Sequence, residues 1–137
     1  METQEMINGL VARSRAAQKV VENYTQEQVD DIAKMFAKVV FDNAEELAKM
    51  AAEESRMGVY EDKVAKCKGK SRIIWNSLKG KKSVGIINRI PEDGIIEVAK
   101  PMGVVCAATP CTNPIVTPMC NAMFAIKGRN TIIISPH

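Results

Sequence analysis

The sequence lacks any continuous apolar run of the roughly 20 residues that a helix needs to cross a bilayer. Residues 1–9 also lack the basic start and apolar core of a secretory signal. Because both features are missing, we expect a cytoplasmic protein that has no membrane partner.

Cysteine and histidine are few and are not spaced as ligands. The four cysteines, Cys67, Cys106, Cys111 and Cys120, show no regular pairing pattern and have no secretory context, so we expect free thiols. Histidine occurs once, at His137, and cannot complete a zinc pattern with these cysteines. The sequence therefore predicts neither a disulfide framework nor a metal site.

An excess of one charge is also missing, since the formal net charge is only +3. Basic residues nevertheless gather between residues 63 and 82, which hold eight Lys or Arg, no acid and Trp75 as the one aromatic residue. A solvated helix face is the interpretation we favour, with no nucleic-acid partner. A surface for an acidic partner, or for a CoA phosphate, is the alternative.

The composition is that of one ordinary globular domain or part of one, with 137 residues and 46% hydrophobic content. Its first half predicts four helices. The first covers 2–21 and the fourth covers 61–79. The second follows Thr25, which forms a capping box with Gln28. The third runs from a start signal at Asp42 and Glu45 to Gly58.

The period of the pattern changes from helical to two after Gly80. Residues 84–90 and 95–99 are short β-type runs separated by a Pro-Glu-Asp-Gly turn, which predicts a β-hairpin. A hairpin alone is marginal in water, so this one should pack against another element or subunit. We expect a homo-oligomer that forms through hairpin residues 84–99.

The last forty residues predict a right-handed β-α-β unit. Residues 104–108 are continuously apolar, as in a strand that is buried on both faces, and residues 132–134 form the next such strand. Between them, Asn113 has the place of a helix cap and Pro114 that of the first helical residue. The buried side of this helix should comprise Val116, Met119, Cys120, Met123 and Phe124.

The turn at 109–114 lies where open α/β sheets bind ligands, beyond the carboxyl end of a strand and before a helix. The simpler interpretation is that Thr109, Thr112 and Asn113 only shape and cap a tight turn. A glycine-rich GxGxxG fingerprint is absent, and two prolines take its place, so an ordinary dinucleotide site is disfavoured.

Several spaced motifs, PMGVV, TPCTNP, NAMFAIKGRNTIII and the final SPH, resemble the amino-terminal part of the CoA-acylating branch of the aldehyde dehydrogenase superfamily. The resemblance extends back through VYEDKVAK and covers nearly the whole chain. Hydrolytic members carry Pro-Trp-Asn-Phe-Pro and Lys-Pro-Ser at the matching places, where this chain has Pro-Cys-Thr-Asn-Pro and Ser-Pro-His.

The resemblance implies an α/β fold in three parts. These are an amino-terminal helical part of the cofactor domain (1–80), an oligomerisation hairpin (81–100), and the first β-α-β unit of a Rossmann-like NAD-binding sheet (101–137), apparently truncated. It also implies a reaction in which a cysteine thiolate adds to an aldehyde, hydride passes to NAD or NADP, and the thioester is transferred to coenzyme A. The family's nucleophilic cysteine lies beyond residue 137, so we expect the chain to be inactive by itself.

The resemblance also assigns candidate site residues. Asn113, with Thr112 beside it, would stabilise the oxyanion of the reaction. Thr109, Pro110 and Cys111 would line the nicotinamide side of the cofactor, and Ser135, Pro136 and His137 would lie near its adenosine end. His137 would then replace the ribose-binding lysine of the hydrolytic branch.

Two alternatives remain open at this point. The chain can be a small non-catalytic binding protein that uses the basic 63–82 helix for an acidic partner. Some family members carry an amino-terminal helix that addresses them to a bacterial microcompartment, but no flexible linker follows the first helix here, so we favour docking on the domain. The aldehyde also stays open, with acetaldehyde, propionaldehyde and sulfoacetaldehyde as candidates.

Overall fold

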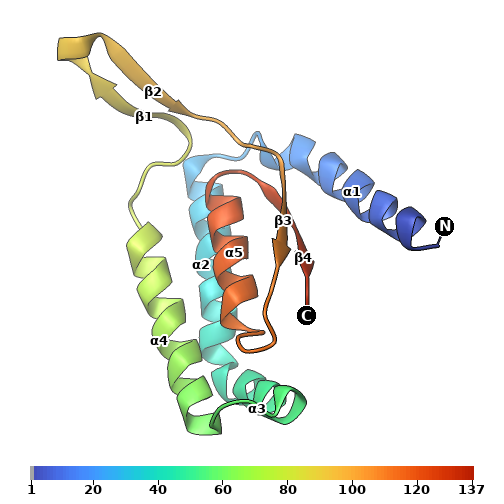
Figure 1. The fold of residues 1–137 in the computed structure, drawn as a ribbon. Coiled ribbons are helices and arrows are strands. Elements are labelled where there is room, and N and C mark those ends of the chain that lie inside the picture. The colour runs from blue at the N-terminus through green and yellow to red at the C-terminus, as the bar shows by residue number, and fades with distance from the viewer. Residues whose placement is uncertain (1) are drawn as a thin grey trace.

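The computed structural model describes residues 2–137 and is mixed α/β (Figure 1). In chain order the elements are α1 (Glu2–Val21), α2 (Gln26–Asp42), α3 (Ala44–Ser55), α4 (Tyr60–Leu78), β1 (Gly85–Ile90), a 3-10 turn (Pro91–Asp93), β2 (Ile95–Ala99), β3 (Val104–Ala108), α5 (Val116–Lys127) and β4 (Thr131–Ser135). Among these residues no helix is long and apolar enough to pass through a membrane.

Helices α2, α4 and α5 pack side by side and hold the core (Figure 1). The core cluster consists of Ala37, Ala44, Cys67, Val116, Met119 and Met123. Met123 is fully buried, as the sequence predicts, but Phe124 is 52% exposed, so its predicted place on the buried side is wrong. The next residue along a helix is turned by about 100°, and here that turn carries the phenyl ring off the packed face.

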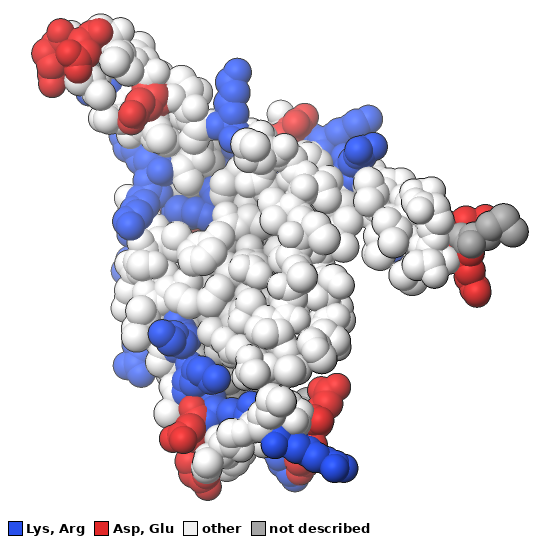
Figure 2. Space-filling view, viewed as in Figure 1, with Lys and Arg blue, Asp and Glu red and all other residues white. Residues whose placement is uncertain are grey.

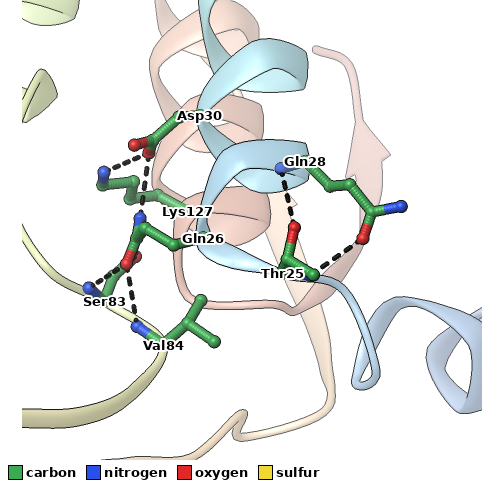
Figure 3. Close-up of polar contacts among 7 residues, drawn as sticks. All are labelled: Thr25, Gln26, Gln28, Asp30, Ser83, Val84 and Lys127. Carbon is green, nitrogen blue, oxygen red and sulfur yellow. Dashed lines mark hydrogen bonds and ion pairs between the residues drawn. The ribbon is translucent and has the colours of Figure 1, made fainter.

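The predicted capping box at the start of α2 is confirmed (Figure 3). The Thr25 hydroxyl accepts the Gln28 amide at 3.3 Å, and the Gln28 side chain accepts the Thr25 amide at 2.9 Å. The predicted start of α3 at Asp42 is wrong, because Asp42 ends α2 and its carboxylate pairs with Lys38 one turn earlier. Asn43 joins the two helices and makes no side-chain cap.

Helix α3 also ends earlier than the sequence suggests. Arg56 adopts the left-handed conformation at the C-cap, two residues before Gly58. The Arg56 amide still bonds the Ala52 carbonyl at 3.0 Å, so the helical bonds of α3 are complete up to this residue.

Strands β3 and β4 are parallel, with Val104 opposite Thr131 and Ala108 opposite Ser135, and α5 connects them. The β-α-β prediction is therefore confirmed. Burial on both faces is wrong for this chain, because β3 buries only Ala107 and leaves Cys106 and Ala108 exposed. The sheet has only two strands, so within residues 2–137 neither strand has a second strand paired to its outer edge.

Strands β1 and β2 form the predicted antiparallel hairpin, with a bulge between Ile86 and Asn88. The hairpin projects from the helical body (Figure 1), and its strands pack mainly against each other. Ile95, Ile96 and Val98 are each about half exposed. The packing partner that such a hairpin needs does not come from the described part of the chain.

The base of the hairpin is tied to the helical body by a polar network (Figure 3). The Gln26 side-chain oxygen accepts the amides of Ser83 and Val84 at 2.7 and 3.1 Å, and its nitrogen donates to Asp30 at 3.0 Å. Asp30 also pairs with Lys127 at the end of α5, whose side chain is only 6% exposed. One ion pair thus joins α2 and α5 beside the start of the hairpin.

The turn between α5 and β4 forms hydrogen bonds with α1, with the connection after α1 and with the end of β2. Arg129 donates to the carbonyls of Glu22 and Ala99, at 2.7 and 3.1 Å. The buried Gln18 of α1 donates to the Arg129 carbonyl and accepts the Thr131 amide, each at 2.8 Å. The second half of α1 therefore docks on the domain.

Charged side chains lie mostly around the periphery of the view in Figure 2, and the face over α5, β3 and β4 carries almost none. The tip of the hairpin is acidic, through Glu92 and Asp93. The division into parts 1–80, 81–100 and 101–137 stays a prediction, and α4 and α5, from two of these parts, share one core.

Candidate functional site

A cavity of about 390 Å³ opens at the carboxyl ends of β3 and β4. It is lined by Glu54, Ser55, Thr109, Pro110, Cys111, Pro114, Pro118, Ile134, Pro136 and His137. Five of the eight candidate residues from the sequence thus border one space. The cavity lies beyond the carboxyl ends of the strands because β3 and β4 run parallel and the chain leaves both strands at the same edge.

Thr109 explains how this edge of the sheet is held together. Its amide donates to the Ser135 carbonyl at 3.0 Å, its hydroxyl reaches the same oxygen at 3.5 Å, and the residue is only 7% exposed. The structural interpretation of Thr109 therefore holds, and its place in the cavity wall is an addition to it. Ser135 is exposed and does not line the cavity.

Asn113 does not cap α5, contrary to the sequence prediction. The helix begins at Val116, after Ile115, and no side chain caps it. A start at Pro114 would need the amide hydrogen of residue 118 for the second helical bond, and Pro118 has none. A start at Val116 places Pro118 in the first turn, where no amide needs a partner within the helix.

Asn113 instead closes a turn, through a long bond of 3.4 Å from its amide to the Pro110 carbonyl. The residue is half-buried and lines neither this cavity nor the neighbouring one. Thr112 is exposed and belongs to the neighbouring cavity of about 420 Å³, between the turn and the loop from Met57 to Val59. The proposed oxyanion donors therefore do not line the cavity that five of the proposed cofactor residues border.

Glu54 and Ser55 are wall residues that sequence reasoning missed. They lie at the end of α3, more than fifty residues before the turn, and nothing in their local pattern distinguishes them from a solvated helix end. The packing of α3 against α4 places its end beside the turn at 109–114 and so brings this carboxylate to the cavity.

The four cysteines are free thiols, as predicted. Burial raises the pKa of Cys67 and of Cys120, so both remain protonated near neutral pH. Nearby lysines partly oppose this effect at Cys67, and a backbone hydrogen bond followed by Lys70 does so at Cys120. Cys111 is half-buried and lines the cavity. Among residues 2–137 no cluster of His, Cys, Asp and Glu has a geometry that can hold a metal ion.

The basic segment at 63–82 is not a uniformly solvated face, which corrects the sequence interpretation. Lys63 is only 6% exposed, and its side chain lies 3.5 Å from where a Cβ would sit at Gly58. Lys68 forms an ion pair of 2.9 Å with Glu45. Part of the positive charge is therefore used to join α4 to α3 and to the loop between them.

A parallel β-α-β unit with a cavity at its strand ends is the arrangement in which open α/β folds bind their ligands. The sequence model of the aldehyde dehydrogenase family matches residues 1–137, and the chain belongs to this family. The resemblance to its CoA-acylating branch is confirmed.

The chain is 61% identical over its whole length to an acetylating succinate-semialdehyde dehydrogenase from Clostridium kluyveri and covers 30% of that protein. It is 45% identical over 125 residues, 90% of this chain and 27% of the relative, to an acylating sulfoacetaldehyde dehydrogenase from Bilophila wadsworthia. The crystal structure of an acetylating aldehyde dehydrogenase from Geobacillus thermoglucosidasius matches with a TM-score of 0.92 at 38% identity, over 97% of this chain and 29% of that chain. The chain thus spans less than a third of these relatives and matches their amino-terminal part.

Proposed function

We propose that the chain supplies the amino-terminal part of the cofactor domain in an enzyme that converts a short aldehyde to its acyl-CoA with NAD or NADP. The observation that carries the proposal is the cavity at the ends of β3 and β4, because residues matched to the family's cofactor side meet there. Two solved relatives support the cofactors. An engineered glycolyl-CoA reductase holds NADP+, at 26% identity and a TM-score of 0.74, and a Rhodopseudomonas palustris propionaldehyde dehydrogenase holds propionyl-CoA, at 26% and 0.75.

The cavity fits one portion of a dinucleotide. Its 390 Å³ lies near the lower end of the range for small-molecule sites, and its prolines and Ile134 offer apolar contacts. Thr109, Pro110 and Cys111 would contact the nicotinamide side, and Pro136 and His137 the adenosine side. The Glu54 carboxylate is the type of group that accepts hydrogen bonds from ribose hydroxyls. When bound, NAD or NADP supplies the hydride acceptor for the oxidation.

The oxyanion role falls to Asn113, with Thr112 beside it. Each preorganised donor aimed at a developing oxyanion contributes a few kcal/mol to catalysis. The backbone amide of Asn113 already bonds the Pro110 carbonyl, so the donor in this role would be its side-chain amide. The nucleophilic thiolate comes from a part of the enzyme outside this chain.

The direct test of the proposal uses the 137-residue chain with NAD, CoA and an aldehyde, with succinate semialdehyde first because of the Clostridium kluyveri relative. We expect no NADH above the rate without protein, because the nucleophile is absent. Stoichiometric or faster NADH formation would contradict this expectation.

A binding measurement tests the cofactor half-site separately. NAD should raise the melting temperature of the chain, because a ligand that binds only the folded state stabilises it. The variant His137→Ala should reduce this shift, and Ser77→Ala, an exposed position outside the cavity, should not. An equal shift in both variants argues against a role for His137, and no shift at all argues against the half-site.

A further inference from the structure

A second pocket, separate from the strand-end cavity, lies in the groove between α2 and α4. It is an open groove with a volume of about 330 Å³. Its lining residues are Lys34, Ala37, Lys38, Phe41, Ser71, Arg72 and Trp75. None of these residues borders the cavity at the strand ends. Helices α2 and α4 pack against each other here. Ala37 on α2 and Ser71 on α4, two small buried residues, line the pocket between them.

The floor of the pocket is apolar and fixed in place. Ala37 belongs to the core cluster, and Trp75 packs against that cluster. Ser71 is only 1% exposed, and its hydroxyl bonds Cys67 and the Met119 sulfur within the core. Phe41 and Trp75 present aromatic surface from opposite helices. A flat apolar group of a ligand can therefore contact aromatic surface on a floor that does not need to rearrange.

The rim of the pocket is positive. Lys34 and Lys38 are one helical turn apart on α2, and the Arg72 guanidinium lies 5.7 Å from the centre of the Phe41 ring. Lys38 pairs with Asp42, which lies outside the lining, and no carboxylate lines the pocket itself. No salt bridge to Lys34 or Arg72 occurs within residues 2–137. Lys34 and Arg72 are thus exposed cations without a carboxylate partner in the described part of the chain, and Arg72 lies over the Phe41 ring.

We infer that this pocket binds a small organic anion made of a flat aromatic group and a phosphate, sulfonate or carboxylate. Aromatic surface below and cations at the rim match the two ends of such a molecule, and neither end alone meets both features. The groove is open and the interactions are few, so a ligand with a two-ring group should bind with a dissociation constant of about 1 mM or tighter. The inference stands apart from the proposed enzyme activity, because it uses none of the residues of the strand-end cavity.

The test uses 1-naphthyl phosphate with the 137-residue chain, whose helix content is first checked by circular dichroism. Trp75 is the sole tryptophan, so its indole N–H gives one resolved signal in a proton–nitrogen NMR spectrum. This signal should shift saturably with the probe. It should shift much less with 1-naphthol, which lacks the charge, or with inorganic phosphate, which lacks the ring.

Matched variants locate the site. Arg72→Gln and Lys34→Gln each remove an exposed rim cation and should weaken binding about three- to tenfold, as expected for partly solvated charge pairs. Lys70→Gln removes the same charge from an exposed position on α4 outside the pocket and should leave binding unchanged. The inference is overturned if the indole signal does not respond, if 1-naphthol binds equally well, or if all three variants lose affinity equally. Since NAD is not the probe, failure here leaves the strand-end cavity test unaffected.

Discussion

The helical body and the hairpin meet the same requirement, burial of apolar surface, to very different degrees. Helices α2, α4 and α5 bury Val29 and Met123 completely against one another. The hairpin leaves Ile95, Ile96 and Val98 about half exposed, although its strands pair from Gly85 and Ala99 to Ile90 and Ile95 with one bulge. The hairpin therefore forms its backbone hydrogen bonds within the chain but does not bury its apolar side chains there.

The difference identifies the apolar surface that stays exposed in this chain. A solitary two-stranded hairpin is marginally stable in water, so its exposed isoleucines fit an interface between subunits, which we propose for residues 84–99. The uncharged face over β3 and β4 is similar (Figure 2). Relatives more than three times as long contain further chain that can cover such a face.

Truncating the core should have the largest effect. Met123→Ala removes a fully buried side chain from the cluster and should lower the free energy of unfolding by about 3 kcal/mol, through lost burial and a residual cavity. Urea unfolding measures this change. Met35→Ala is the control, because Met35 is 62% exposed, and its effect should stay within about 0.5 kcal/mol. Similar losses for the two variants would remove the contrast between core and surface.

The second largest loss of stability should follow from breaking the ion pair between Asp30 and Lys127 beside the hairpin base. Asp30→Asn leaves the Lys127 ammonium with almost no access to water and without its counter-charge, which should lower the free energy of unfolding by about 2 kcal/mol. The matched control is Asp42→Asn, which breaks the exposed pair with Lys38 and should cost less than about 0.5 kcal/mol. Equal costs would mean that the buried pair contributes no more than the exposed one.

The third effect is a difference in thiol reactivity between the core and the sheet. Cys67 and Cys106 should differ about tenfold in their rates of alkylation, which corresponds to about 1.4 kcal/mol. Burial raises the pKa of Cys67, so at a given pH less of it is thiolate than for an ordinary thiol, and iodoacetamide should modify it more slowly than the exposed Cys106. Peptide mass spectrometry across a pH series measures both rates. The folded state holds the Cys67 proton more tightly than the unfolded state does. The free energy of unfolding should therefore fall as the pH rises above the ordinary thiol value of 9.0. Equal rates would show that α4 opens readily.

The smallest effect is expected in the hairpin. Ile96→Thr should change the free energy of unfolding of the isolated chain by less than about 0.5 kcal/mol, because the side chain is already 51% exposed. If residues 84–99 form an interface, sedimentation analysis should show that the same variant shifts any oligomer toward monomer. A loss above about 1 kcal/mol in the monomer would place Ile96 in an internal contact.

Local patterns predicted the elements well wherever a short-range rule operates. The capping box at Thr25, the reversal at 91–94 and the apolar periods of α2 and β3 each involve residues within a few positions of one another. The start of α5 was wrong because Asn113 and Pro114 satisfy the same local rule, but Pro118 removes the amide that a helix from Pro114 would need.

Long-range contacts explain what the pattern missed in the candidate site. Glu54 lines the first cavity because α3 packs against α4 with its end beside the turn, and Thr112 lines a separate cavity with the loop after α3. The GRN part of the longest family motif also proved structural. Arg129 and Asn130 hold the α1–α2 connection and the strand linker through carbonyl and amide bonds.

The order of helices and strands, the parallel β-α-β unit and the family follow from the amino-acid sequence, because periodicity, caps and motifs act between near neighbours along the chain. The division of the candidate residues between two cavities, the buried pair of Asp30 and Lys127, and the aromatic pocket between α2 and α4 arise from packing alone. Each of these joins residues from separate elements, and their distances depend on how whole helices dock, which no local pattern encodes.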